Sequence, residues 1–155
     1  MIGFETSYRW TMRTGLRPED LGGFLDEPHV AVLATLRSDG GVLLSPVWHR
    51  WHDGGFELWV GPDDVKVRHL RRDPRATIVV AESVPPLRGI EVRGTTTLVE
   101  ERAFETAASI ASRYLGAARG RAYVESTGDA HLIIRLVPGA LRAWDFADEH
   151  DEMRS

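Results

Sequence analysis

The chain has 155 residues and a formal net charge of −4 at neutral pH. A chain of this length is most simply a single domain, residues 1–155, able to bury roughly 70% of the surface that its unfolded form exposes. The negative charge argues against a general nucleic-acid binder, because such proteins usually carry a basic field. The absence of cysteine excludes disulfides, thiolate metal sites and cysteine nucleophiles, and is consistent with a cytoplasmic protein.

The two ends of the chain are expected to lie outside the folded core. Residues 1–16 form an N-terminal extension in which charged residues interrupt the aromatic ones, so it lacks the apolar core of a signal peptide. Residues 147–155 are rich in acids and are expected to form a mobile tail. No apolar stretch approaches the length of a membrane span, so no membrane association is expected.

The predicted elements begin with a short helix over residues 18–25 and continue mainly as strands. Runs rich in β-branched and apolar residues, separated by turns rich in Gly and Asp, predict three strands over residues 29–36, 42–51 and 56–60. Hairpin turns this short predict an antiparallel meander for the first three strands.

The second half of the chain is also predicted to consist mainly of strands, with two helices between them. A basic helix is followed by predicted strands, by a helix that Gly116 ends, and by two final strands that Pro138-Gly139 separates. The ranges are 75–81 and 90–99 for the strands, 102–115 for the helix, and 131–137 and 141–146 for the last two strands. Six or seven strands with few helices predict a mostly β protein, a closed or nearly closed antiparallel barrel, with a β-sandwich as the alternative.

The segment from Asp63 to Pro74 is the best candidate for an anion site. It concentrates basic side chains on one short helix between two strands, namely Lys66, Arg68, Arg71 and Arg72. Pro62 fits the first turn of that helix, and Pro74 stops it. The alternative is an ordinary solvated helix face. The adjacent acids Asp63 and Asp64 are interpreted as residues that complement the helix dipole, not as a catalytic pair.

The strand over residues 42–51 carries Pro46 in its interior. Proline cannot donate to a sheet, so Pro46 indicates an edge, a bulge, or a place where something other than a strand lies alongside. The alternative is an edge strand whose tryptophans simply pack in the core. His49 and His52 lie three apart on this strand and face opposite sides, so no metal site is expected. Motifs for serine hydrolases and for nucleotide-binding loops are absent.

Together these residues resemble the split β-barrel flavin and deazaflavin oxidoreductase superfamily, the group related to pyridoxamine 5'-phosphate oxidase. The most specific match is the block from Lys66 to Pro74, which fits the superfamily's Lys-x-Arg-x-Leu-Arg-x-Asp-Pro pattern. The resemblance also covers the strand at 29–36 and the motifs Ser45-Pro46-Val47-Trp48, Glu91-Val92-Arg93-Gly94 and Trp144-Asp145-Phe146.

The resemblance implies a homodimer with a flavin-like cofactor at each subunit interface. The cofactor ring would lie along Ser45 to Trp48, Lys66 would reach the phosphate of the cofactor side chain, and His69 matches a position near that phosphate. The implied cofactor-binding residues are Leu43, Ser45, Pro46, Val47, Trp48, Val60, Lys66, Arg68 and His69. Asp63 and Asp64 precede the lysine, and acids beside a phosphate would repel it unless they point away.

The branch that the chain most resembles favours coenzyme F-420, a deazaflavin with a phosphate and a polyglutamate tail. Arginines in the middle of the chain and at Arg119 and Arg121 suit such an anionic tail. The leading hypothesis is therefore an F-420-dependent reductase that delivers hydride to an electron-poor double bond or imine, with the proton from His49, Arg50 or solvent. The alternatives are an oxidase or flavin reductase that binds flavin mononucleotide (FMN), and a non-catalytic dimer that stores a ring-shaped cofactor.

Overall fold

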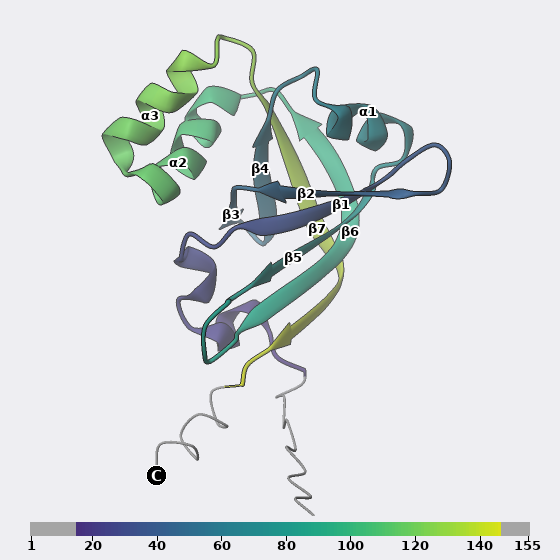
Figure 1. Ribbon diagram of the computed structural model, residues 1–155, viewed down its shortest axis with the longest axis vertical. Coiled ribbons are helices and arrows are strands. Elements are labelled where there is room, and N and C mark those ends of the chain that lie inside the picture. The colour runs from purple at the N-terminus through teal and green to yellow at the C-terminus, as the bar shows by residue number, and fades with distance from the viewer. Residues whose placement is uncertain (1–14, 147–155) are drawn as a thin grey trace, which may run out of the picture.

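The computed structural model of the protein describes residues 15–146. Seven strands form one antiparallel sheet that curls into a half-barrel, with three α-helices and two 3-10 helices around it (Figure 1). This confirms the predicted mostly β, split-barrel architecture. Almost all of the predicted N-terminal extension and the whole acidic tail lie outside the described residues. Within residues 15–146, no helix is long and apolar enough to span a membrane.

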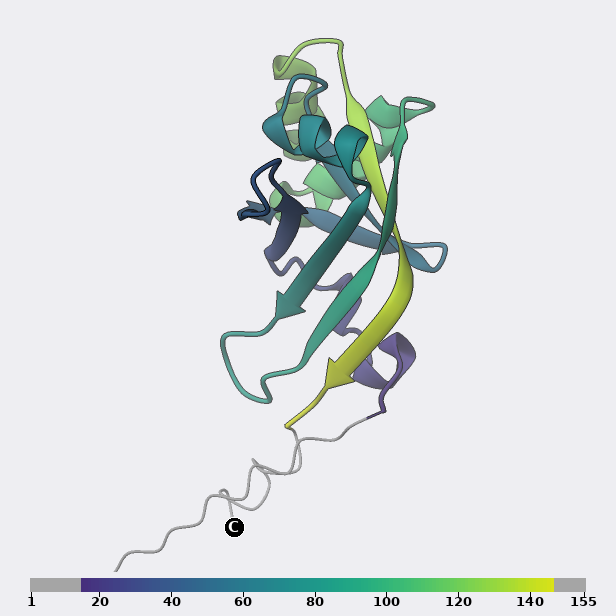
Figure 2. The same ribbon diagram turned by 90° about the vertical axis from the view of Figure 1, so that its right-hand side faces the viewer.

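The sheet follows the order β2-β1-β5-β6-β7-β4-β3, and each neighbouring pair is antiparallel. The strands are β1 (Ala31–Leu36), β2 (Val42–Val47), β3 (His49–His52), β4 (Gly55–Val60), β5 (Arg75–Ala81), β6 (Gly89–Val99) and β7 (Leu132–Trp144). The helices are η1 (Pro18–Leu21), η2 (Phe24–Asp26), α1 (Val65–Arg72), α2 (Ala103–Leu115) and α3 (Ala117–Ser126). The curl and the long, bent β6 and β7 are visible from the side in Figure 2.

The strand predicted over residues 42–51 is in fact two strands that meet at Trp48. β2 pairs with β1, whereas β3 pairs with β4 at the opposite end of the sheet order, so the meander prediction was wrong in treating this segment as one strand. The hydroxyl group of Tyr114 holds the bend. It donates a hydrogen bond to the carbonyl oxygen of His29 at 2.8 Å and accepts one from the backbone N–H of His49 at 3.1 Å.

The two strands predicted at the end of the chain are one continuous strand, β7. Arg93 of β6 pairs with Ala140 and Gly94 pairs with Pro138, so Gly139 is an extra residue and the sequence Pro138-Gly139 forms a bulge instead of a turn. The opposite position requires glycine, because a Cβ atom on Gly94 would lie 2.0 Å from the carbonyl oxygen of Val137.

The helix α3 was not predicted from the sequence. It begins directly after Gly116, the residue that ends α2 as predicted, and the two helices lie side by side (Figure 1). Gly120 permits this close approach, since a Cβ atom there would lie 2.5 Å from the backbone nitrogen of Ser112. The short helix predicted over residues 18–25 is instead the pair of 3-10 helices η1 and η2.

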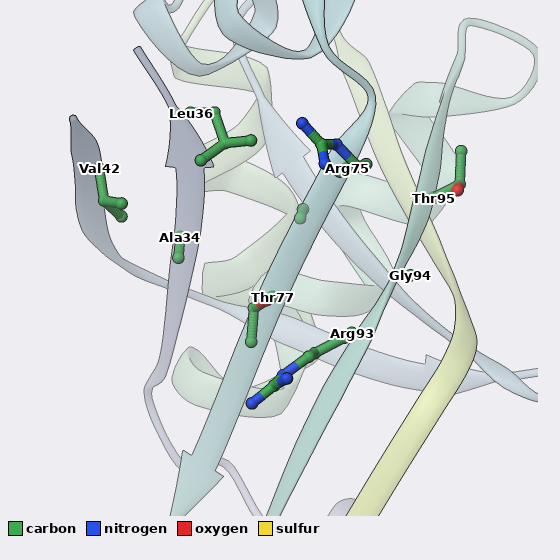
Figure 3. Close-up of a pocket in the computed structure, with 9 residues that line it drawn as sticks. Ala34, Leu36, Val42, Arg75, Thr77, Arg93, Gly94 and Thr95 are labelled. Atoms are coloured by element: carbon green, nitrogen blue, oxygen red, sulfur yellow. The ribbon is translucent and has the colours of Figure 1, made fainter. Parts of the chain in front are cut away.

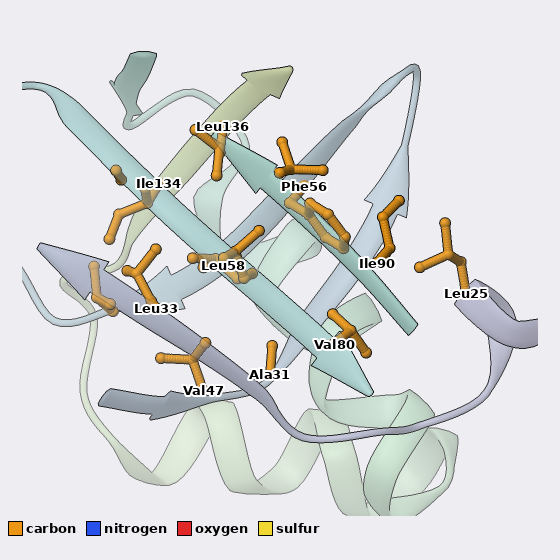
Figure 4. Packing of buried hydrophobic residues seen from close by; sticks show 14 of the residues in the cluster. Leu25, Ala31, Leu33, Val47, Phe56, Leu58, Val80, Ile90, Ile134 and Leu136 are labelled. Atoms are coloured by element: carbon orange, nitrogen blue, oxygen red, sulfur yellow. The ribbon is translucent and has the colours of Figure 1, made fainter. Parts of the chain in front are cut away.

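The main hydrophobic core fills the inside of the curled sheet (Figure 4). Alternate residues of the strands point into it, including the fully buried Leu33, Phe56, Leu58 and Ile134. A second cluster lies between the α2–α3 pair and the strands β4 and β7, and consists of Ala103, Ala107, Ile110, Ala111, Val124 and Ile133. Burial of each large aliphatic or aromatic side chain contributes about 1.5–3 kcal/mol. The second cluster fixes α2 and α3 against the barrel.

Candidate functional site

Helix α1 begins at Val65 with Asp64 as its N-cap, so Pro62 lies before the helix and not in its first turn as predicted. The Asp64 side chain caps the helix by accepting a hydrogen bond from the backbone N–H of Lys66 at 2.9 Å. Val67 and Leu70 are buried toward the barrel, and Asp73 ends the helix before Pro74, as predicted. The sequence therefore places the first turn of a capped helix, with the positive end of its dipole, at Lys66.

A cavity of about 500 Å³ lies beside this turn. The end of β2, the end of β4, the start of α1 and the middle of α3 all contribute to it. Its lining residues are Val30, Pro46, Val47, Trp48, Trp59, Val60, Gly61, Asp64, Lys66 and Tyr123. β2 stands at the end of the sheet order, so Pro46 lies on an edge strand, which is one of the three explanations that its missing N–H allowed.

The cavity brings together five of the residues that the family resemblance singled out. Pro46, Val47, Trp48, Val60 and Lys66 all line it, although they come from three different elements.

Leu43 and Ser45 lie on the same strand as Pro46 but do not line the cavity. They pair with Thr35 and Leu33 of β1, which are buried, and the alternation of β2 turns their side chains toward the core side of the sheet. Their predicted contact with a cofactor stays a prediction.

Arg68 and His69 also lie outside the cavity lining. Arg68 is exposed on α1, whereas His69 is buried, with its Nδ1 atom 2.9 Å from the hydroxyl oxygen of Thr35. Burial, together with the nearby positive charge of Arg72, lowers the pKa of His69. The imidazole is therefore neutral at neutral pH and adds no positive charge beside the cavity.

The charge of Lys66 is shared with its own helix cap. The Lys66 ammonium group lies 3.0 Å from the Asp64 carboxylate, and the lysine side chain is only 14% exposed. Asp63, by contrast, is exposed and does not line the cavity. Of the two acids next to the predicted phosphate site, Asp63 therefore lies outside the cavity. The Asp64 carboxylate competes with a cofactor phosphate for the ammonium group of Lys66.

Two aromatic residues of the cavity, Trp59 and Tyr123, were missed by the sequence analysis. Trp59 lies next to Val60 on β4, and Val60 was a predicted cofactor-binding residue, so the sequence could have indicated Trp59 as well. Tyr123 gave no such signal, because it belongs to the unpredicted helix α3.

Neither side chain proposed as a proton donor lines the cavity. His49 is fully buried between the rings of Phe56 and Tyr114, and its two ring nitrogens have no hydrogen-bond partner among residues 15–146. Burial, with a smaller contribution from Arg113, lowers the pKa of His49 to about 4. Arg50 lies 3.3 Å from the carboxylate of Glu57, to which it donates hydrogen bonds, and lines a separate polar groove.

One group of residues outside the cavity has the geometry of metal ligands. Glu27, His29 and Glu82 place one ligand atom each within 4.8 Å of one another. The guanidinium group of Arg88 already binds both carboxylates, lying 3.1 Å from Glu27 and in direct contact with Glu82. The group is therefore an ion-pair network that ties η2 to the β5–β6 hairpin.

Comparison with known proteins gives the family of the chain and relatives of its fold. A family model described as pyridoxamine 5'-phosphate oxidase matches residues 18–145. A conserved hypothetical protein of Mycobacterium tuberculosis is 25% identical, with a TM-score of 0.75 over 87% of this chain and 88% of that one. No curated protein matches the sequence significantly.

Two further solved structures share the fold. One is named an F420 reductase and is 23% identical, with a TM-score of 0.62 over 77% of this chain and 93% of that one. The other is an FAD-binding protein of Mesorhizobium loti, 17% identical, with a TM-score of 0.61 over 86% and 96% of the two chains. The family match spans nearly all of the described fold, and the chain therefore belongs to the pyridoxamine 5'-phosphate oxidase family of split β-barrel proteins, which bind flavin-type cofactors and include oxidoreductases.

Proposed function

We propose that the protein is a coenzyme F-420-dependent oxidoreductase. The observation that carries the proposal is the single cavity in which Lys66, at the start of α1, faces the apolar end of the edge strand β2. A flat ring with an anionic side chain needs both features in one place. The similarity to a structure named an F420 reductase supports the choice of cofactor within the family.

The residues present fit such a cofactor. Pro46, Val47 and Val60 offer an apolar strip for the ring, and Lys66, at the positive end of the α1 dipole, offers a site for the phosphate. Arg119 is exposed on α3 and does not line the cavity. We propose that it attracts the carboxylates of a polyglutamate tail that extends beyond the cavity.

A reduced deazaflavin, when bound, supplies hydride for an electron-poor double bond or imine of the substrate. The protein binds and orients the two partners and keeps water from the apolar part of the cavity. No side-chain nucleophile is required. Because His49 and Arg50 lie outside the lining, we assign the proton to solvent that enters from the open side of the cavity.

Calorimetric titration with each cofactor tests this proposal. We expect F-420 to bind more tightly than FMN, and the gap to narrow as salt is added, because the polyglutamate tail carries more negative charges for salt to screen. Equal or reversed affinities would favour the FMN-dependent oxidase or flavin reductase. Tight F-420 binding without turnover of any acceptor would favour the storage dimer.

We further propose that the protein is a homodimer that uses the outer face of the β2-β1-β5-β6 sheet. Val42 and Leu44 of β2 are 53% and 64% exposed on this face, next to Ala34 and Leu36 of β1. A hollow of about 460 Å³ lies on the same face. Its lining side chains, which include Arg75 and Arg93, are drawn in Figure 3. Val30 and Pro46 line the candidate cofactor cavity, and Pro46 shares the outer face of β2 with Leu44. A second subunit on this face would therefore reach the cavity rim.

Sedimentation velocity at micromolar concentration should give twice the chain mass of 17.3 kDa. Leu44→Glu would place a charge in the apolar face and should shift the protein toward monomer and weaken F-420 binding as well. Val84→Glu is the control, because Val84 is equally exposed, at 62%, but lies in the loop between β5 and β6. A wild-type monomer that binds F-420 tightly would contradict the proposal.

A further inference from the structure

Tyr123 lies between the two tryptophans of the cavity. Its ring centroid is 5.8 Å from that of Trp48 and 5.8 Å from that of Trp59, and the ring planes meet at 55° and 83°. All three rings line the same cavity. Tyr123 is nevertheless 46% exposed, so a large part of its surface faces open space. The three rings form an aromatic wall, defined as Trp48, Trp59 and Tyr123.

The aromatic wall is held rigidly from behind. Trp48 stacks on Tyr114, with centroids 4.7 Å apart and planes at 7°, and the Tyr114 hydroxyl group is fixed by the hydrogen bonds at the β2–β3 bend. Trp59 is backed by the ring of His131 at 5.9 Å. Gly120 seats α3 closely on α2 and so sets the position of Tyr123. A wall with so little freedom loses little entropy when a flat molecule binds to it.

The aromatic wall and the charged residues Asp64 and Lys66 line the same cavity but come from different elements. Asp64 and Lys66 come from the start of α1, whereas Tyr123 comes from α3, and these helices lie on opposite sides of β4 (Figure 1). On the proposed function, the cofactor phosphate occupies the α1 side and the ring lies along Pro46 to Trp48. The side formed by Trp59 and Tyr123 is then left for the substrate, and it offers aromatic faces and no ionised group.

We propose that Trp59 and Tyr123 form a substrate subsite for a flat, uncharged aryl group that is conjugated with an electron-poor carbon–carbon double bond. The inference rests on the proposed function for its chemistry, but not for the binding of the aryl group. Edge-to-face and offset contacts with two rings favour an aromatic guest over an aliphatic one of the same length. Tyr123 and Trp59 are thus specificity-determining residues.

The reaction with such a substrate balances without any further reagent. A C–H bond of the reduced cofactor breaks, and its hydrogen and both electrons form a new C–H bond at the β carbon of the conjugated ketone. A proton from solvent then forms the second C–H bond at the α carbon. The substrate double bond becomes a single bond, and the deazaflavin is left oxidised.

The test compares two ketones that differ only at the end of the double bond. Benzylideneacetone carries a phenyl group there, and ethylideneacetone carries a methyl group. Calorimetry with F-420-loaded and cofactor-free wild-type protein should show tighter binding of benzylideneacetone in both forms. Tyr123→Leu, which keeps apolar bulk but removes the ring, should weaken binding of benzylideneacetone about two- to tenfold. It should leave the affinity for ethylideneacetone and for F-420 unchanged.

Two further variants test whether binding depends on the ring of Tyr123 itself, and not on its hydroxyl group or on aromatic residues outside the cavity. Tyr123→Phe keeps the ring and should bind benzylideneacetone like the wild type. Phe104→Leu changes an aromatic residue next to His131 that does not line the cavity, and should also have no effect. Thermal unfolding of each variant confirms that the partly exposed position at residue 123 tolerates the change.

The outcomes distinguish the subsite from the proposed function. If wild-type protein fails to bind F-420 but still binds benzylideneacetone in a way that depends on Tyr123, the proposed function fails and the subsite stands. If Tyr123→Leu weakens F-420 as much as benzylideneacetone, the wall holds the cofactor and the subsite is overturned. Equal binding of the two ketones by wild-type protein would overturn it as well.

Discussion

Replacement of Lys66 by alanine is expected to weaken F-420 binding about tenfold to a hundredfold and to leave the free energy of unfolding nearly unchanged. Lys66 lines the cavity from the first turn of α1, where the helix dipole already favours an anion. A hydrogen bond to a charged group contributes roughly 1.5–3 kcal/mol, which corresponds to that range of affinity. Calorimetric titration with F-420 measures the loss directly.

The ion pair between Lys66 and Asp64 allows a second substitution that should strengthen F-420 binding where Lys66→Ala weakens it. Asp64→Asn keeps a side chain that caps a helix as well as aspartate does, but it removes the negative charge 3.0 Å from the lysine ammonium group. We therefore expect Asp64→Asn to bind F-420 more tightly than the wild type, most clearly at low salt.

Arg71→Ala is the matched control for both variants. Arg71 is exposed near the other end of α1, whereas Arg72 donates a hydrogen bond to the carbonyl oxygen of Leu36 and is less suitable. If Lys66→Ala and Arg71→Ala weaken binding equally, the helix acts only as a solvated basic face and the phosphate site lies elsewhere.

The parts of the candidate site that were predictable from the sequence are those with strong local signals. The block from Lys66 to Pro74 has a fixed spacing and a proline stop, and Pro46 identifies an edge strand by its missing N–H. These signals act over a few residues, so they do not depend on the rest of the fold. Together with the family resemblance, they predicted that Lys66 and the end of β2 hold one cofactor, and the structure places both in the lining of one cavity.

The parts that were not predictable depend on contacts between distant residues. Gly120 lowers the helix propensity of residues 117–126, yet its close packing on Ser112 stabilises α3 in the folded protein. The break at Trp48 likewise needs Tyr114, which lies far along the chain. Tyr123 reaches the cavity only because α3 exists, so sequence patterns gave no reason to include it.

The buried His49 predicts a loss of stability on mild acidification. Its pKa is about 4 in the folded protein, because burial disfavours the charged ring, against the usual value of 6.5 in the unfolded chain. Between these values the unfolded chain binds the proton more strongly, so the stability that His49 contributes is complete above pH 6.5 and falls as the pH drops toward 4. The contribution of His49 to the free energy of unfolding should decrease by about 2 kcal/mol from pH 7.5 to pH 5, and by roughly 3 kcal/mol once the folded form is also protonated. His69, whose pKa is lowered as well, adds a loss of the same sign that is common to the wild type and to variants at position 49.

Urea unfolding at pH 7.5 and pH 5 of the wild type and of His49→Leu isolates this contribution. Leucine leaves no ring nitrogen to protonate, so the variant should lose about 2 kcal/mol less than the wild type over this interval. The lowered carboxyl pKa values of Glu27 and Asp73 act only below about pH 4.5 and stay outside the window. His52→Leu, an exposed position on the same strand, is the control and should follow the wild type. If His49→Leu and the wild type lose equal stability, then the imidazole of His49 gains a partner on protonation and does not remain isolated in the core.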